Sequence, residues 1–259
     1  MTRQTDPIVS MTSSASRRRC GRRILRIGIA VVLLGAAAPV SLLLRPLVSS
    51  NLGTVDPGRV IRAAQPTSQL PQLIKDHHLA SILNLRGGSS KDPWYETEVR
   101  TAQASGVAFF DFPLNATKRP TRRELLMLID FFDRCQYPLL IHCKAGADRT
   151  GLASALYLMM QRNEPPRQAI RAFTLYHGHI PLFGTERLHE PLDEYAQWLD
   201  SQGLAHTPAR FREWVKNDYR SADPSIEPSP LVPGPQKPLY PRSRTSGSCR
   251  VGWEARDRR

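Results

Sequence analysis

One stretch of this chain constrains its fold more than any other. A short apolar run at residues 138–142 leads into the segment HCKAGADRTG at 142–151, and a long apolar run begins at Leu152. A short apolar run is typical of a fully buried strand, and a longer one of a buried helix. Glycine within the connecting segment allows it to curl tightly. The order strand, loop, helix predicts an α/β domain.

The same alternation continues upstream and downstream of this stretch. Short runs rich in β-formers alternate with amphipathic stretches, which indicates a central, mostly parallel sheet flanked by helices. We predict strands over residues 60–64, 81–85, 107–112 and 138–142. We predict helices near residues 68–78, 94–105, 121–134, 150–162, 166–177 and 186–201. Thr121 followed by Glu124 is a capping-box pattern and marks the start of one of these helices.

Composition divides the chain into three predicted parts, residues 1–50, 51–219 and 220–259. The two ends carry most of the net charge of +13. Residues 1–50 hold eight Lys or Arg and one acid, and residues 220–259 hold eight Lys or Arg and four acids. The middle part has 20 basic and 18 acidic residues, so we expect no nucleic-acid partner. The last part contains seven prolines mixed with Ser, Gly and Arg. We expect that part to be disordered.

The N-terminal part resembles a membrane anchor. An arginine-rich stretch, residues 17–26, precedes the apolar run from Ile27 to Leu44, which contains no charge. As a helix this run would be about 27 Å long, close to the roughly 30 Å of a bilayer's hydrocarbon core. We predict a single-pass membrane protein with residues 27–44 as the anchor. Because arginines favour the cytoplasmic side, we expect a cytoplasmic N-terminus and an extracytoplasmic middle part.

Two other interpretations of the N-terminal part stay open. Residues 36–38 are alanines and resemble the cleavage site of a signal peptide, although Pro39 is a poor residue after a cut. Residues 7–55 contain no acid and are rich in Arg and Ser, as organellar presequences are.

The segment 142–151 is suited to binding a phosphate group. A loop between a parallel strand and a helix presents free N–H groups and the positive end of the helix dipole to an anion. This setting favours the thiolate form of Cys143, which is a nucleophile. Arg149 can present two donors to two phosphoryl oxygens. Further contacts to the phosphate or the sulfur are expected from His142, Lys144, Ala145, Gly146, Ala147 and Thr150.

The string matches an HCxxGxxRTG pattern and resembles the protein tyrosine and dual-specificity phosphatase superfamily. Residues 62–66 and 84–86 resemble its compact bacterial, plant and fungal branch, so the resemblance covers roughly residues 55–200. It implies phosphomonoester hydrolysis through a phosphocysteine intermediate, without a metal or an organic cofactor. Phosphotyrosine in a protein is the leading substrate, and a phosphoinositide or other phospholipid head group is the alternative. A pseudophosphatase, which binds phosphate without turnover, is the alternative function.

Such phosphatases also need an acid that protonates the leaving oxygen. Asp111 lies 32 residues before Cys143, which is near the separation of some thirty residues typical of the superfamily, and it ranks first. The loop that follows it, residues 113–120, contains no acid. Asp148 ranks second, because an acid just before the loop arginine resembles the myotubularin and Sac-type phosphoinositide phosphatases. Asp148 can equally serve to orient Arg149.

Other chemically active residues receive no role. The cysteines are too scattered for a disulfide framework, and no CxxC spacing suggests a structural metal. His177 and His179 have no carboxylate or cysteine at ligand spacing, so we interpret them as loop histidines. A solvated helix start, rather than a second phosphate site, is the favoured interpretation of the basic residues Lys118, Arg119, Arg122 and Arg123.

Overall fold

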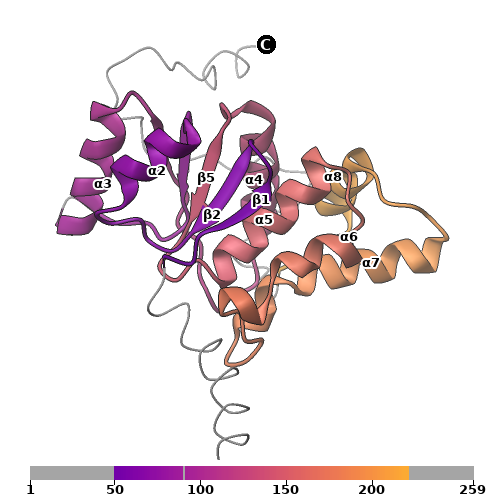
Figure 1. Cartoon of the computed structure of the whole chain (residues 1–259). Coiled ribbons are helices and arrows are strands. Elements are labelled where there is room, and N and C mark those ends of the chain that lie inside the picture. Colours follow the sequence, from indigo (N-terminus) through magenta and orange to yellow (C-terminus); the bar gives the residue numbers. More distant parts are fainter. Residues whose placement is uncertain (1–49, 90, 222–259) are drawn as a thin grey trace, which may run out of the picture. The chain divides into compact units, whose positions relative to one another are not determined.

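A five-stranded sheet forms the centre of the computed structural model, which describes residues 50–89 and 91–221 (Figure 1). The strands are β1 (Gly53–Asp56), β2 (Val60–Ala63), β3 (Ser81–Asn84), β4 (Ala108–Asp111) and β5 (Leu139–His142). Their order in the sheet is β1-β2-β5-β3-β4. All pairs are parallel except β1 with β2. The predicted fold class, an α/β domain with a mostly parallel sheet, is therefore confirmed.

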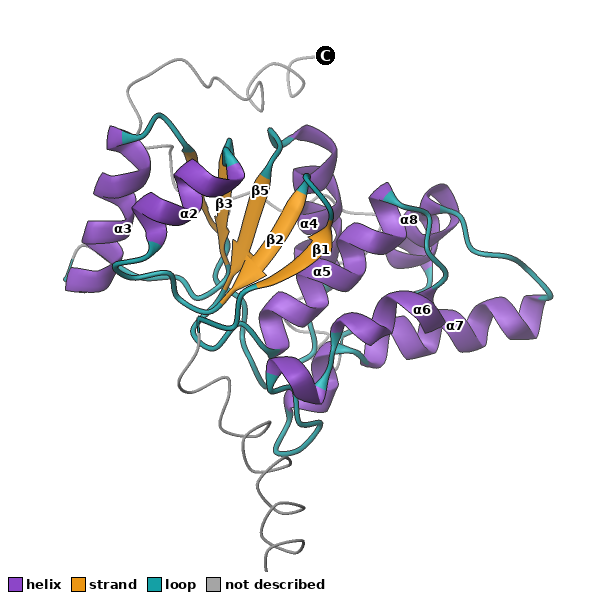
Figure 2. Cartoon of the chain, viewed as in Figure 1, coloured by secondary structure: helices purple, strands orange, loops and turns teal. Residues whose placement is uncertain are grey.

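Helices cover both faces of this sheet (Figure 2). One face carries α2 (Leu70–His77) and α3 (Pro93–Ala104), and the other carries α4 (Arg122–Arg134), α5 (Asp148–Gln161) and α8 (Pro208–Asn217). Leu139 and Ile141 of β5 pack in the core beneath α4 and α5, whereas Leu140 packs against the α2 side. This alternation follows from the two-residue period of a strand. It explains why each predicted strand is apolar on both faces.

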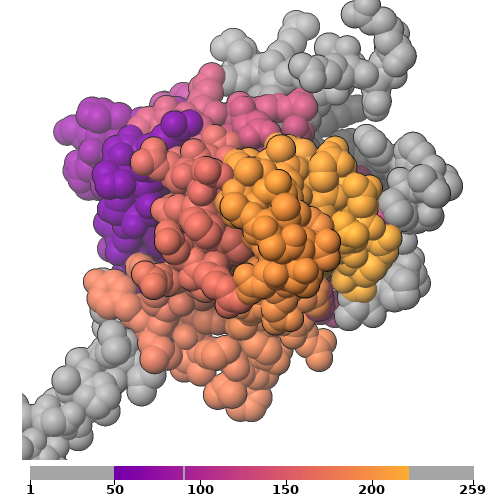
Figure 3. Space-filling model, turned by 90° about the vertical axis from the view of Figure 1, so that its right-hand side faces the viewer, coloured from indigo at the N-terminus to yellow at the C-terminus, as the bar shows by residue number. Residues whose placement is uncertain are grey.

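Between α5 and α8 the chain forms five short or medium-length helical elements. They are α6 (Pro166–Ala169), the 3-10 helices η1 (Ile170–Ala172), η2 (Leu175–His177) and η3 (Thr185–Leu188), and α7 (Glu190–Gln202). Figure 3 shows that α7 and α8, in orange to yellow, form much of the surface on this side. The continuous helix predicted near residues 166–177 is wrong. Thr174 is extended and caps η2 through its side chain, and Gly178 ends η2 in a left-handed conformation.

The remaining local predictions agree with the structure in part. Thr121 caps α4, its side chain accepts from the Glu124 N–H, and the Glu124 side chain accepts in return, so the capping box is confirmed. The short antiparallel strand β1 and the helix α8 were not predicted.

The register of the sheet aligns the last residues of its parallel strands at one edge. Ala63 of β2 pairs with His142 of β5, His142 with Asn84 of β3, and Asn84 with Asp111 of β4. The last residues of four parallel strands therefore lie in one row. The loops that follow these strands meet along this row, where α/β proteins bind their ligands.

The predicted membrane location is corrected. Within residues 50–89 and 91–221, no helix is long and apolar enough to cross a bilayer. The single-pass location, with a cytoplasmic N-terminus and an extracytoplasmic middle part, relied on the apolar run and the arginines before it, and it is contradicted by this finding. The apolar run 27–44 lies outside the described residues, as does the predicted tail from residue 222 onward. The boundaries of the three predicted parts stay predictions.

Candidate active site

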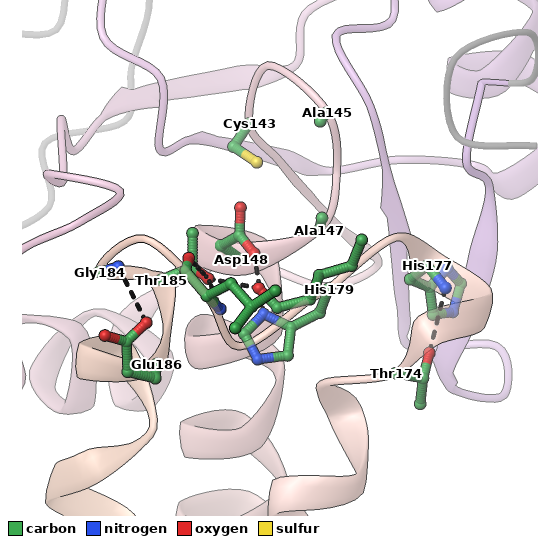
Figure 4. Close-up of polar contacts among 12 residues, drawn as sticks. Cys143, Ala145, Ala147, Asp148, Thr174, His177, His179, Gly184, Thr185 and Glu186 are labelled. Carbon is green, nitrogen blue, oxygen red and sulfur yellow. Dashed lines mark hydrogen bonds and ion pairs between the residues drawn. The ribbon is translucent and has the colours of Figure 1, made fainter. Parts of the chain in front are cut away.

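The loop 143–149 leaves the end of β5 and runs into α5 (Figure 4). Cys143 opens it and is only 2% exposed. The Cys143 sulfur accepts a hydrogen bond from the backbone N–H of Gly146 at 3.2 Å. The loop therefore curls around the sulfur, as expected for an anion-binding turn.

The carbonyl oxygens of four successive loop residues accept hydrogen bonds from outside the loop. Gln65 N donates to Lys144 at 3.3 Å, Asn51 Nδ2 to Ala145 at 2.8 Å, and Arg62 Nη2 to Gly146 and Ala147 at 2.8 and 3.2 Å. In a trans peptide the C=O of one residue and the N–H of the next point in opposite directions. The N–H groups of residues 145–148 are therefore directed into the loop, where they form a cradle of donors beside the sulfur.

Arg62 is the central support of this cradle. It lies on β2, is 2% exposed, and donates also to the carbonyl oxygen of Ala172 at 2.6 Å. Burial lowers the pKa of Arg62 to about 10, although the charges of Cys143 and Asp148 oppose this shift. The guanidinium therefore stays charged at neutral pH behind the loop. Its role was not predicted, yet a charge inside an apolar four-residue strand signals an obligatory partner.

Asn51 provides a second support that the sequence did not indicate. Its side-chain amide donates to the carbonyl oxygens of Ala145 and His177, both at 2.8 Å. Its Oδ1 lies 3.0 Å from Nδ1 of His177. Asn51 thus joins the loop to η2, and the interpretation of His177 as a simple loop histidine omitted this contact.

Arg149, the predicted phosphate clamp, lies at the carboxyl edge of the sheet. Its Nη1 donates to the carbonyl oxygens of Leu85 and Leu114 at 3.3 and 3.4 Å. These residues follow β3 and β4 respectively. Both hydrogen bonds are long, and charged phosphoryl oxygens are stronger acceptors than carbonyl groups. A bound phosphate would therefore compete well for this guanidinium.

Three further residues predicted to contact the phosphate or the sulfur, His142, Thr150 and Lys144, differ in burial and in hydrogen-bond partners. His142 is fully buried, and its Nε2 lies 2.8 Å from Oε1 of Glu98 on α3. The Thr150 hydroxyl is buried and has no hydrogen-bond partner within the described part of the chain, so the expected bond to the sulfur is not formed there. Lys144 is exposed. Its side chain is thus accessible to a ligand above the loop.

Asp111 is engaged elsewhere on the same edge. Its Oδ1 accepts from Asn84 Nδ2 at 2.8 Å, and its Oδ2 accepts from the Tyr95 hydroxyl. Burial raises the pKa of the Asp111 carboxyl above its usual range, and these two hydrogen bonds oppose the shift. In the register row, Asp111 is two strands away from His142, a separation of roughly 10 Å. Both carboxylate oxygens therefore serve a buried network.

Asp148 lies within the loop, at the first position of α5. Its carboxylate is 23% exposed, and Oδ1 lies 2.8 Å from Nδ1 of His179. In Figure 4 the other carboxylate oxygen is directed to the side on which the Cys143 sulfur lies. The structure thus places the Asp148 carboxylate on the side of the loop where the sulfur lies, and it adds a contact with His179, which was predicted to be a simple loop histidine.

An anion-binding loop that opens with cysteine, closes with arginine and connects a parallel strand to a helix defines a cysteine-dependent phosphatase of the dual-specificity type. The chain belongs to the family described as DSP-PTPase phosphatase fused to NAD+ kinase, whose model matches residues 49–183. A curated relative, inositol diphosphatase DSP1 of Oryza sativa subsp. japonica, is 29% identical over 178 residues. That match covers 66% of this chain and 72% of the relative.

Solved structures with a similar arrangement include two phosphatases. Tk-PTP in its active form is 20% identical, with 56% of this chain and 97% of that chain covered and a TM-score of 0.45. The core catalytic domain of the PP-IP phosphatase SIW14 from S. cerevisiae, in complex with citrate, is 16% identical. There the coverage is 59% and 93%, and the TM-score is 0.45.

Proposed function

We propose that this protein hydrolyses phosphate esters with Cys143 as nucleophile and Arg149 as phosphate clamp. The observation that carries the proposal is the set of four outward carbonyl groups, which directs the loop N–H groups toward the sulfur. The thiolate attacks phosphorus, an S–P bond forms, and the ester P–O bond breaks. Water then attacks the phosphocysteine and releases inorganic phosphate. Charge on the phosphoryl oxygens is met by the N–H cradle and Arg149 in both steps.

Asp148 is our proposed acid, in preference to Asp111. Asp111 already accepts two hydrogen bonds in a buried network. Asp148 is partly exposed, precedes Arg149 directly, and has one carboxylate oxygen beyond the His179 contact. In the first step it gives its proton to the leaving oxygen, and in the second it takes a proton from the attacking water.

The Gly146→Ala variant tests the cradle. Gly146 has a φ of +69°, and a Cβ there would lie 2.6 Å from backbone atoms of Ala63 and Ala64. Since strand β2 cannot yield easily, we expect the loop to shift and kcat/KM for an aryl phosphate to fall about 10²-fold. Gly58→Ala is the matched control, because Gly58 has a φ of +70° with no atom within 4 Å of the added Cβ. Equal activity of the two variants would contradict the cradle.

Phosphotyrosine in a protein remains our first proposed substrate. A second class, inositol phosphates including phosphoinositide head groups and inositol diphosphates, has two supports. Lys144 and Lys118 are exposed and can meet additional phosphates, and the rice relative is named an inositol diphosphatase. Arg119, by contrast, is committed to Glu194 and Glu190. Only part of the basic stretch at 118–123 is therefore offered to a polyanionic ligand.

A substrate panel combined with Lys144→Ala separates these classes. The panel contains a phosphotyrosyl peptide, a phosphoseryl peptide, a phosphoinositide and an inositol diphosphate. If inositol phosphates are the substrate, Lys144→Ala should raise their KM about 10-fold, because one charge-assisted contact is lost. The KM of the phosphotyrosyl peptide should change little. Lys75→Ala, an exposed lysine on α2, is the control. Failure to hydrolyse even an activated aryl phosphate would instead indicate a pseudophosphatase.

A further inference from the structure

His179 is held rigidly against the start of α5. Its ring is 5% exposed and lies 4.7 Å from the ring of Phe173 and 5.7 Å from that of His189, between centroids. Phe173 in turn packs on Gly151, where an added Cβ would come within 2.7 Å of the Phe173 ring. The His179 backbone N–H donates to the carbonyl oxygen of Thr174 at 2.9 Å. The imidazole therefore has a fixed place beside the first turn of the helix.

The polar contact of this ring within the described residues goes to Asp148. Nδ1 lies 2.8 Å from Asp148 Oδ1, while Nε2 is buried and has no hydrogen-bond partner in residues 50–89 and 91–221. A neutral imidazole has a single N–H, and donation to a carboxylate places it on Nδ1. The ring thus offers one donor to one carboxylate oxygen.

We propose that His179 is a positioning residue that directs the transferable proton of Asp148. This inference rests on the proposed function, in which Asp148 is the acid. A protonated carboxyl has one O–H and one carbonyl oxygen, and an N–H donor pairs with the carbonyl oxygen. Because Nδ1–H occupies Oδ1, the O–H is placed on Oδ2, on the Cys143 side in Figure 4. The proton leaves from Oδ2 to the leaving oxygen and returns to Oδ2 from water.

A rigid neighbour is needed here because a free carboxyl group can rotate. Asp148 lies at the first position of a helix and is 23% exposed, so its own packing constrains it weakly. Rotation would interchange Oδ1 and Oδ2 and turn the proton away from the leaving oxygen. A hydrogen bond from a buried ring removes this freedom, as second-layer partners of reactive groups do elsewhere.

The test compares His179→Leu with His179→Asn. Leucine removes the donor but fills the space, whereas the Asn amide nitrogen can take the place of Nδ1. The rate constant to compare is kcat/KM, which reports only the steps up to formation of the phosphocysteine. For His179→Leu we expect kcat/KM for a phosphotyrosyl or alkyl phosphate to fall about 10- to 100-fold. For an activated nitrophenyl phosphate, which leaves without a proton, it should fall less than about 3-fold. His179→Asn should recover most of the lost rate.

Two further variants make the outcome decisive. In Asp148→Asn, adding His179→Leu should cost nothing more, because residues that act as one unit are not additive. His189→Leu is the structural control: this ring belongs to the same aromatic cluster but bonds to Asp193 at 2.8 Å. His189→Leu removes packing but no contact to Asp148, so any loss of rate in this variant should be the same for activated and poor substrates. Melting temperatures of all variants show whether they fold.

Each result has a definite meaning. If His179→Leu slows activated and poor substrates equally, or if His179→Asn recovers nothing, the positioning role is overturned while Asp148 remains the acid. If Asp148→Asn itself shows no dependence on the leaving group, the acid assignment of the proposed function fails, and the inference fails with it.

Discussion

The Cys143→Ser variant should lose turnover and retain phosphate binding. The serine hydroxyl is not ionised at neutral pH and is a poor nucleophile without a base, so we expect kcat to fall by at least about 10⁴-fold. The Gly146 N–H donates to the sulfur, but the other N–H groups of the cradle and Arg149 do not depend on the thiol, so inorganic phosphate should still bind. The measurements are initial rates with an aryl phosphate and calorimetric titration with phosphate.

Cys135→Ser is the control for this variant. Burial raises the pKa of the Cys135 thiol to about 11, so it is uncharged at neutral pH, and it lies at the end of α4. Its replacement should leave the rate unchanged. If Cys143→Ser kept even a few per cent of the original rate, hydrolysis through a phosphocysteine would be wrong.

The second large effect is expected from Asp148→Asn. An acid matters most when the leaving group is poor, so the rate with a phosphotyrosyl or alkyl phosphate should fall about 10²- to 10⁴-fold more than with nitrophenyl phosphate. The measurement is kcat/KM, which excludes the later hydrolysis of the phosphocysteine, for a series of leaving groups of increasing basicity. Its slope should steepen in the variant.

Asp111→Asn should behave differently. An amide offers one acceptor oxygen in place of two, so the hydrogen bond from Asn84 or from Tyr95 is lost or must be reversed, and stability should fall by about 1–3 kcal/mol. All substrates should be slowed to a similar extent. The reverse pattern, with leaving-group dependence in Asp111→Asn, would identify Asp111 at the end of β4 as the acid. If neither variant discriminates, a water-mediated acid or a pseudophosphatase becomes the working hypothesis.

The fold could be predicted where local patterns decide it. The strand, loop and helix around Cys143 and the capping box at Thr121 depend on residues a few positions apart, and both were found. Strand β1 was missed because it is an edge strand of four residues whose burial does not alternate: Gly53 and Val55 are half-buried, Thr54 is exposed and Asp56 is buried. The break between α6 and η2 was missed because helical periodicity extends through Thr174, which prefers to cap.

Residues of the candidate site could likewise be predicted only where they lie close together in the sequence. Cys143, Asp148 and Arg149 belong to one loop and are visible in one string. Asn51 lies 94 residues before Ala145, and His179 lies 31 residues after Asp148. No spacing rule connects such pairs, because the sheet and α5 bring them together. Arg62 is an intermediate case, since its isolated charge was visible but its acceptors were not.

The outward carbonyl groups have a consequence for how such an enzyme can change its preference. The cradle is held from behind by Arg62, Asn51 and the backbone of Gln65, none of which depends on the side chains of Lys144 or Ala145. Those two side chains are exposed. Under the function that we propose, substitutions at these two positions would alter which molecule is accepted and leave the hydrogen bonds that hold the loop in place. Selection could then act on the choice of substrate while the bond-breaking groups stay fixed.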